Sequence, residues 1–527
     1  MARLLPLALT SLALLSVTPR AALAVSDAEV GRAVDKGRDY LLKLQDRKDG
    51  AFRDVWAPKG YRSGETALAL LALLKAGVEP QDPRILAGFD WLLDQKIERV
   101  YDVSVAVLAV EALYMPEKQK SIQDPAPLAT QVRKRFHKQA PGRVRKWLVQ
   151  AAKFLSKHQH EGGLWRYPFY GDPDVSNAQF AVLALKAAHR LGVKVDLGVF
   201  WKVAEALVEC QQASGAKVAS FPVPAADRKI AGLLDRRTKR KKKKRRTGNS
   251  SSTRTRGEEE TPILTTSTTQ RMQARGWGYR PGDAPRGSMT AAGVAILVVC
   301  KSELEAHDRY EKELAPKVNR ALRDGAAWLA ANFAVDKNPG AEPDWLFYYL
   351  YTLERAGTLL ALERFGGRAW YEEGAQAILS RQEGDGRFLA KTSGQADGDL
   401  AGTCLALLFL ERSTVPVMKR VATGSVAVSA ARGPSVKDLP DGQLEVTFRY
   451  GGLPGRKVAV AGSFNGWSKD SHVLRDTGEG RYELVVTLPK GPHEYKFVLD
   501  GTQWELDPHN PSRQDDGKGN TNSVVGR

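Results

Sequence analysis

Two tryptophans near the C-terminal end of the chain offer the clearest chemistry in the sequence. Trp467 stands in GSFNGW and Trp504 in DGTQWELDP. A flat indole ring covers the apolar face of a sugar, which makes an exposed tryptophan pair a typical carbohydrate platform. The alternative is that both rings fill the core of their own domain. We expect both indole planes to face solvent and to lie close enough to coplanar to hold a saccharide chain.

Four alternating apolar stretches surround these tryptophans and must position them. They cover residues 444–450, 457–461, 482–488 and 493–499, and Gly, Pro, Asn or Asp bounds each one. Alternation with turn signals between the stretches indicates antiparallel strands rather than helices. The last 85 residues or so therefore predict a β-sandwich.

Three motifs in this region, VAVAGSFNGWSKD, LPKGPHEYKFVLDGTQWELDP and GNTNSVV, occur in a known order and spacing. From about residue 444 to 525 the chain resembles the glycogen-binding domain of the AMP-activated protein kinase beta subunit. It also resembles the carbohydrate-binding module that precedes isoamylase-type debranching and branching enzymes. The resemblance implies an immunoglobulin-like sandwich that binds α-glucan.

The same resemblance implies the roles of individual residues. Trp467 and Trp504 would stack on glucose rings, Lys496 would hydrogen-bond sugar hydroxyls, and Asn520 and Asn522 would close the site. The chain departs from the family pattern at Lys518 and Asn520, where that domain has a leucine and a threonine. We therefore expect different packing of this loop over the sugar.

The region from about residue 25 to 413 repeats one unit, in which an amphipathic helix is followed by a Gly-aromatic turn and a strongly apolar helix. Six such pairs can be counted. The first helices are expected near 30–45, 84–95, 144–159, 197–212, 318–333 and 370–382. The apolar helices are expected to begin near Ser63, Asp102, Asp174, Ser288, Asp344 and Asp399. Outer amphipathic helices that shield inner apolar ones predict a six-hairpin α/α toroid.

A glutamine precedes the turn in four of these units, at Gln45, Gln159, Gln211 and Gln382. These turns resemble the glutamine-tryptophan repeats of squalene and hopene cyclases and of the protein prenyltransferase barrels. In that family the turns are structural, because Gln amides and stacked aromatic rings link the helix ends. The resemblance predicts the same links here.

Catalysis in the ring would need a strong acid or a carboxylate pair. Hopene-type cyclases protonate an alkene with a DxDD motif, of which this chain keeps Asp172 and Asp174 but has Val175 at the last position. Similar polar residues recur at the other helix starts, which favours helix capping for Asp174. Carboxylates that could instead form a glycosidase-type acid and base at the mouth are Glu65, Asp102, Asp174, Asp344 and Asp399.

The remaining motifs predict no metal site and no cofactor. Cys210, Cys300 and Cys404 each lie in an apolar run, which indicates small buried hydrophobic side chains. Five aromatic residues crowd the fifth hairpin between 345 and 351, and core packing is favoured over a substrate wall.

Residues 1–24 have the layout of a cleavable secretory signal, with Arg3, an apolar run over 4–17, and Ala22-Leu23-Ala24 before Val25. The expected location is periplasmic or extracellular, with no transmembrane segment after cleavage. Much of the net charge of +19 lies in a tract that contains KRKKKKRR, within a disordered insertion over about 214–270. Behind an export signal the tract predicts no specific nucleic-acid site, and a polyanion contact is the alternative to a solvated loop.

The sequence thus predicts four parts: a signal over 1–24, a toroid over 25–413, a linker over 414–442 and a carbohydrate-binding sandwich over 443–527. The predicted function is that of an exported α-glucan-binding protein whose toroid serves as a platform. The alternatives are a carbohydrate-active barrel enzyme and a diverged terpenoid cyclase that uses Asp174 as its acid.

Overall fold

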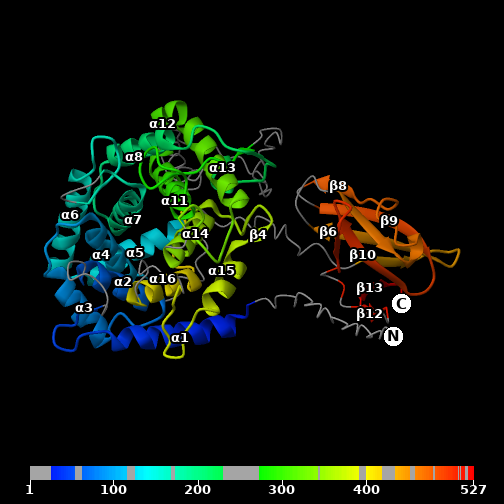
Figure 1. Ribbon diagram of the computed structural model, residues 1–527, viewed down its shortest axis with the longest axis horizontal. Helices are drawn as coiled ribbons and strands as arrows, with labels where there is room; N and C mark the ends of the chain where they lie inside the picture. The colour runs from blue at the N-terminus through cyan, green and yellow to red at the C-terminus, as the bar shows by residue number, and fades with distance from the viewer. Residues whose placement is uncertain are drawn as a thin grey trace, which may run out of the picture.

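The computed structural model describes residues 25–53, 62–115, 125–167, 172–228, 272–341, 345–390, 399–417, 434–451, 457–478, 481–507, 510, 512–516 and 520–526. The predicted signal at 1–24, the KRKKKKRR tract and Asp344 lie outside these residues. Figure 1 shows a helical part and a β-domain.

Six apolar helices form a closed inner ring, in which each helix packs against the next and the sixth packs against the first. In chain order they are α2 (Arg62–Lys75), α4 (Val100–Leu113), α7 (Val175–Leu191), α11 (Gly287–Leu304), α14 (Leu346–Leu360) and α16 (Asp399–Leu410). Their residues are buried almost all round, as at α11, which is long and apolar enough to cross a membrane but is 94% buried within the molecule. The predicted inner layer is therefore confirmed.

Six amphipathic helices cover this ring (Figure 1). They are α1 (Asp27–Lys43), α3 (Pro83–Leu93), α6 (Gly142–Lys157), α8 (Leu197–Cys210), α13 (Ala315–Ala331) and α15 (Trp370–Leu379). Each buries one stripe, and α6 buries Val144, Trp147, Leu148, Ala151 and Leu155 while its lysines stay exposed. Two concentric layers of six helices make the predicted α/α toroid.

The glutamine side chains link successive outer helices, as the resemblance implied. Gln45 Nε2 donates to the carbonyls of Gly50 (2.7 Å) and Arg84 (2.8 Å). Gln382 Nε2 donates to those of Gly386 (3.1 Å) and Ala33 (2.8 Å), which joins the last outer helix to the first. Corresponding bonds from Gln159 reach Gly163 and Val199, and those from Gln211 reach Arg275 and Ala321. Each amide satisfies one carbonyl of its own turn and one of the next outer helix.

Among the described residues, three helices were not predicted: α5 (Pro125–Gln139), α9 (Pro224–Asp227) and α12 (Asp308–Glu313). The stretch expected as the start of the disordered insertion also holds structure, because β1 (Lys217–Val218) pairs with β2 (Met272–Gln273). Strands β3 (Arg364–Phe365) and β4 (Arg368–Ala369) form a short hairpin before α15. No disulfide joins the three cysteines; Cys300 and Cys404 are buried as expected, while Cys210 is half-buried.

The β-domain is a sandwich of two antiparallel sheets. One sheet has the order β5 (Ser435–Asp438), β6 (Gln443–Gly451), β9 (Arg481–Pro489), β8 (Arg475–Gly478). In the other, β10 (His493–Leu499) pairs with β7 (Val458–Gly462), β11 (Gln503–Glu505) and β13 (Thr521–Val525), and β13 pairs with β12 (Arg513–Asp515). Strand β5 lies inside the stretch expected as a linker over 414–442, so the sandwich begins earlier than predicted. Phe448, Tyr495 and Phe497 are part of the core between the sheets.

Candidate carbohydrate-binding site

The outer face of the second sheet carries the predicted site. Along β10, Tyr495, Phe497 and Leu499 belong to the sandwich core, so the alternate residues Lys496 and Val498 lie on the opposite face. Trp504 pairs with Val498 in the β10–β11 register and therefore shares its face. Val498 is only 1% exposed although it lies outside the core cluster, because other side chains cover this face.

Trp467 approaches the same sheet from a short loop. The loop follows β7 through the single turn η2 (Ser463–Asn465) and Gly466, whose φ is +63°. Asn465 fixes this loop, because its Oδ1 accepts from Gly462 N (2.9 Å) and its Nδ2 donates to Val460 O (3.0 Å). Trp467 itself has φ +60°, and its backbone N–H donates to Gly462 O (2.9 Å). The GSFNGW motif therefore builds a rigid mount for one indole.

The two indoles lie beside each other, with ring centroids 6.4 Å apart and planes inclined by 45°. Trp504 is 44% exposed, and Trp467 is half-buried. Lys469 Nζ donates to Gly501 O (3.2 Å), which ties the Trp467 loop to the turn that precedes Trp504. Neither ring belongs to the sandwich core. The pair is tilted rather than coplanar, which differs from the expectation.

Polar residues lie on the same face as Trp504. Asn522 shares this face by its register, but it is only 3% exposed and its Nδ2 donates to Glu494 Oε2 (2.6 Å). Glu494 was not predicted as a residue of this face. Its position two residues before Lys496 in an alternating strand places both side chains on the same face of the sheet and could have indicated it. Lys496 is half-buried on β10. The sheet thus brings Lys496, Trp504 and Asn522 to one surface.

Asn520 is placed differently from the other predicted residues. It is exposed and closes a small loop, because its Nδ2 donates to Asp516 Oδ2 (3.0 Å) and its N–H to Asp516 Oδ1 (3.0 Å). Lys518, which departs from the family pattern, lies outside the described residues. The loop therefore has its own internal hydrogen bonds at Asn520, and the packing difference expected there stays a prediction.

The ring acids were the other set of candidates, and Asp174 is a helix cap. It is 1% exposed at the N-cap of α7, where Oδ1 accepts from Asn177 N (2.6 Å) and Oδ2 from Asn177 Nδ2 (2.8 Å). Burial raises the pKa of Asp174 to about 6, and the hydrogen bonds from Asn177 oppose that rise. Asp172 is exposed and lies 3.5 Å from Arg280 Nη1. The capping interpretation of Asp174 is confirmed.

Asp102 does not cap its helix, which corrects the idea of one polar cap at every inner helix start. Helix α4 begins at Val100, so Asp102 lies in its first turn, and the N-cap Arg99 makes no side-chain cap bond. Asp102 is 8% exposed, and among the described residues its Oδ1 has no hydrogen-bond partner. Burial raises the pKa of Asp102 to about 7, Arg99 lowers it, and the nearby Glu65 raises it further.

The other helix starts also differ from simple caps. Asp399 Oδ2 forms an ion pair with Arg387 Nη1 (2.8 Å). Ser288 exchanges hydrogen bonds with Asn338, whose Oδ1 accepts from Ser288 N (3.0 Å) and whose Nδ2 donates to Ser288 Oγ (3.1 Å). Asp399 and Ser288 are therefore each held by a local partner, whereas Glu65 and Asp102 are the two candidate carboxylates that lie close enough to affect each other.

Aromatic side chains of neighbouring inner helices contact each other around Phe180. Phe180 packs edge-on against Tyr101 (4.8 Å between centroids) and stacks on Tyr348 (6.2 Å), and the Arg355 guanidinium lies 5.1 Å from its ring centre. Tyr348 Oη and Ser176 Oγ are 2.8 Å apart. Most of the fifth hairpin is buried as expected, but Trp345 is 47% exposed. Among the described residues, these rings therefore form one packed cluster near the N-terminal ends of α4, α7 and α14.

A small cavity of about 60 Å³ with a mixed charged and apolar lining lies near the C-terminal ends of the inner helices. Its lining includes Lys75, Glu111, Lys186, Arg190 and Arg355. Most of these charges have partners, since Glu111 pairs with Arg190 and Glu303 with Lys186 and His189. A volume of this size holds a few waters rather than a polyene chain.

The chain that leaves α16 lines this cavity. Thr414 Oγ1 donates to Glu354 Oε2 (2.6 Å), and Thr414 N to Glu354 Oε1 (3.3 Å). Val415 and Val417 pack on the ring core. The first residues of the predicted linker are therefore part of the toroid. In the described ranges, no group of three or more His, Cys, Asp or Glu residues is placed to hold a metal ion.

Comparison with known proteins bears first on the β-domain. Residues 444–526 match the family model described as the glycogen recognition site of AMP-activated protein kinase. Over 77 residues the chain is 39% identical to 5'-AMP-activated protein kinase subunit beta-1 of Sus scrofa, which is 14% of this chain and 59% of that protein. Over 80 residues it is 34% identical to Phosphoglucan phosphatase LSF1, chloroplastic, of Arabidopsis thaliana, which is 15% of this chain and 13% of that protein.

The β-domain is therefore a glycogen-recognition type of carbohydrate-binding module, as the sequence motifs indicated. The chain spans less than two thirds of the length of these curated relatives. A solved structure of the type II terpene cyclase MstE from Scytonema, in complex with geranylgeranyl dihydroxybenzoate, covers 74% of this chain and 98% of its own. Its TM-score is 0.39 at 9% identity.

Proposed function

We propose that this protein is exported and binds α-glucan of the glycogen or starch type through Trp467, Lys496, Trp504, Asn520 and Asn522. The single observation that carries the proposal is the tryptophan pair beside Lys496 on one sheet face. Its rings are 6.4 Å apart and inclined by 45°. An α-1,4-linked glucan curves along its length, so successive sugars present inclined faces that suit an inclined pair. A flat β-1,4-linked chain suits coplanar rings.

Affinity for a single site is expected to be modest. Two stacked rings and a few hydrogen bonds must offset the loss of translational freedom, which predicts a dissociation constant of roughly micromolar to millimolar. Such a site retains the protein on a polymer that offers many copies of the ligand. The toroid then serves as a platform attached to the polysaccharide. Export is supported by the signal-like layout of residues 1–24.

The enzyme alternatives have less support. Both carboxylate oxygens of Asp174 accept hydrogen bonds from Asn177, and with a pKa of about 6 the group is mostly ionised at neutral pH. An alkene needs a neutral, strong acid as its proton donor.

The test is retention of the full-length protein on glycogen, starch, cellulose and chitin. We expect retention on the two α-glucans, and we expect Trp504→Ala or Trp467→Ala to weaken it by roughly 5- to 150-fold, as for loss of about 1–3 kcal/mol of ring stacking. Trp345→Ala is the matched control, because that tryptophan is exposed on the toroid. Equal retention of all three variants would refute the site. Export is tested on the secreted protein, whose mature chain should begin at Val25.

A further inference from the structure

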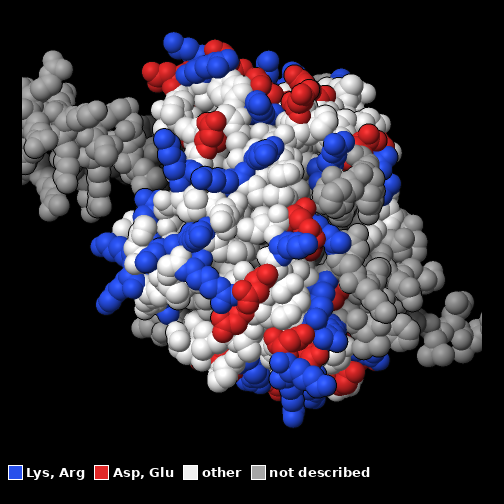
Figure 2. All heavy atoms as spheres, turned by 90° about the vertical axis from the view of Figure 1, so that its left-hand side faces the viewer, with Lys and Arg blue, Asp and Glu red and all other residues white. Residues whose placement is uncertain are grey.

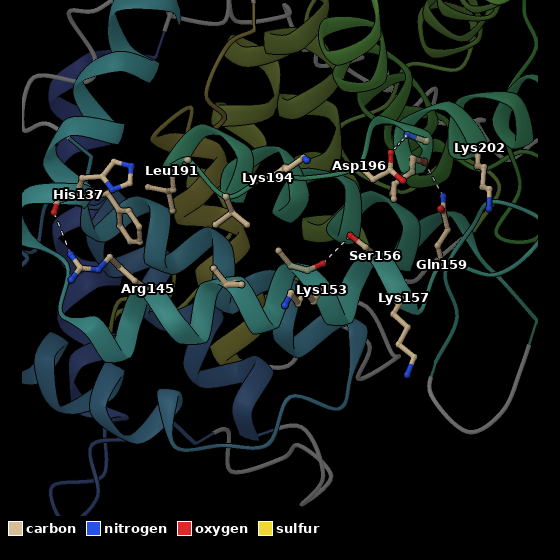
Figure 3. Close-up of a pocket in the computed structure, with 17 residues that line it drawn as sticks. His137, Arg145, Lys153, Ser156, Lys157, Gln159, Leu191, Lys194, Asp196 and Lys202 are labelled. Carbon is tan, nitrogen blue, oxygen red and sulfur yellow. Dashed lines mark hydrogen bonds between the residues drawn. The ribbon is translucent and has the colours of Figure 1, made fainter.

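A basic groove lies on the toroid, outside the carbohydrate module. It has a volume of about 890 Å³, which falls in the usual range of ligand sites, about 300–1,000 Å³. Helix α6 forms one wall, and the segment that joins α7 to α8, together with the start of α8, forms the other (Figure 3). Helix α5 closes one end with His137.

The charged residues of this groove are almost all cationic. They are Arg145, Lys153, Lys157, Lys194 and Lys202, with Asp196 as the one carboxylate in the lining. The side chains of all five cations are exposed. Asp196 caps α8, where its Oδ1 accepts from Gly198 N (3.0 Å). Within the described part of the chain, no ion pair to a carboxylate is recorded for the five cations. Figure 2 shows Lys and Arg side chains spread over the face that carries α6.

The cations are arranged along the groove rather than around a point. Arg145, Val149, Lys153 and Lys157 follow each other at four-residue spacing on α6, so they form one stripe with a rise of roughly 6 Å per step. In Figure 3, Arg145 lies near one end of the groove, and Lys157 and Lys202 lie near the other. A compact anion would need converging donors, whereas this row matches a linear polymer with repeated negative charges.

The scarcity of open aromatic rings in the groove, together with the carbohydrate-binding module of the same chain, indicates which kind of polymer binds. Phe136 is only 3% exposed, so the one open ring that the described lining offers to nucleic-acid bases is the His137 imidazole at the end of the groove, whereas single-strand binders line their groove with successive stacking rings. The same chain has a carbohydrate-binding module at residues 444–526. A polysaccharide with acidic groups could therefore occupy both surfaces of one protein.

We propose that this groove binds an anionic stretch of polysaccharide, with carboxylate or phosphate groups on its sugars. The proposal rests on the polysaccharide function of the C-terminal module for its choice of polymer, and on the charges of α6 and α8 for its location. Binding is through exposed point charges, so salt weakens it strongly.

The test compares two fourfold variants of the full-length chain. K153Q/K157Q/K194Q/K202Q removes lysines of the groove, and K36Q/K43Q/K312Q/K317Q removes four equally exposed lysines from other helices. Both variants keep the KRKKKKRR tract, so any contribution of that tract is the same. The ligands are polygalacturonate and neutral glycogen, with polyglutamate and a single-stranded oligonucleotide of equal charge.

We expect the groove variant to bind polygalacturonate about tenfold more weakly than the wild type and the control variant, which corresponds to a few tenths of a kcal/mol per exposed charge. Its retention on glycogen should not change, because that reports Trp467 and Trp504. The version with four Lys→Arg changes should keep its affinity, and this separates charge from a folding defect.

Two results would overturn the proposal. One is equal affinity of the groove and control variants for polygalacturonate. The other is a groove-dependent loss for the oligonucleotide or polyglutamate as large as the loss for polygalacturonate, which would show another class of polyanion as the occupant. Failure of the wild type to bind glycogen would count against the proposed function alone.

Discussion

The link that closes the ring gives the sharpest test of the toroid. Gln382 Nε2 donates to Ala33 O (2.8 Å) and Gly386 O (3.1 Å), so one amide joins α15 to α1 across the whole length of the ring sequence. Gln382→Ala removes both bonds and leaves two carbonyls without this donor. Net values of about 0.5–1.5 kcal/mol for each bond predict a loss of about 1–3 kcal/mol in the free energy of unfolding.

The assay is urea unfolding of the full-length chain, followed by far-UV circular dichroism at 222 nm, a wavelength that reports helix. Gln95→Ala is the matched control, because Gln95 also follows an outer helix but donates only to Trp91 O (2.8 Å) of that same helix. We expect the control to lower stability by about 0.5–1.5 kcal/mol, half the loss for Gln382→Ala, because it removes one bond instead of two. If both variants lower the unfolding midpoint equally, the reasoning that the Gln bridges hold neighbouring hairpins together is wrong.

Two buried carboxylates give further predictions. Burial holds the pKa of Asp102 at about 7 in the folded state, above its ordinary 3.8, so ionisation of Asp102 favours unfolding and the stability of the protein falls as pH rises from 4 towards 7. Asp102→Asn should remove this slope and be more stable than the wild type at pH 8 by roughly 2–4 kcal/mol. An unchanged slope would contradict the raised pKa of Asp102. For Glu303, burial raises the pKa, but the hydrogen bond from His189 and the charge of Lys186 outweigh it and lower the pKa to about 2. The stability that ionised Glu303 contributes is therefore present above pH 4.5 and is lost as pH falls towards 2. At pH 7, Glu303→Gln should lower the free energy of unfolding by about 3–5 kcal/mol, because Lys186 is left without its carboxylate partner. Thermal unfolding of Glu303→Gln beside the exposed Glu313→Gln would measure this, and equal effects would contradict it.

The hairpin pattern of the ring could be predicted because its physical cause is local. A strongly apolar helix such as α11 must lie inside, and an amphipathic one such as α6 must lie outside, whatever the rest of the chain does. The structural role of the turn glutamines could also be predicted, because Gln, Gly and an aromatic residue recur together in these turns. Helix α5 was missed, since it adds a further helix where the repeat predicts none.

The start of α4 shows why the capping prediction failed in one hairpin. Asp102 and Asp174 both stand in a DVS sequence, but α7 begins after its aspartate and α4 begins two residues before. The buried Val100 and half-buried Tyr101 extend α4 towards its N-terminus, which places Asp102 inside the helix. The residue at which each helix begins depends on packing against neighbouring helices, so the three residues of the DVS sequence do not predict it.

The charges inside the ring could not be predicted either. Glu111 pairs with Arg190 and Lys186 with Glu303, although these partners are far apart in the sequence and lie on different helices. In the β-domain the motif located both tryptophans, whereas their inclination of 45° depends on the φ of +60° at Trp467 and on the Lys469 contact with Gly501.

The attachment of Thr414 has a mechanical consequence. Since Thr414 is bonded to the buried Glu354 and Val415 and Val417 pack on the core, the connection to the β-domain starts from the axis of the toroid rather than from its rim. A pull on the β-domain would therefore reach the toroid first at the contact between Thr414 and Glu354 of the inner helix α14, before it reaches the end of α16.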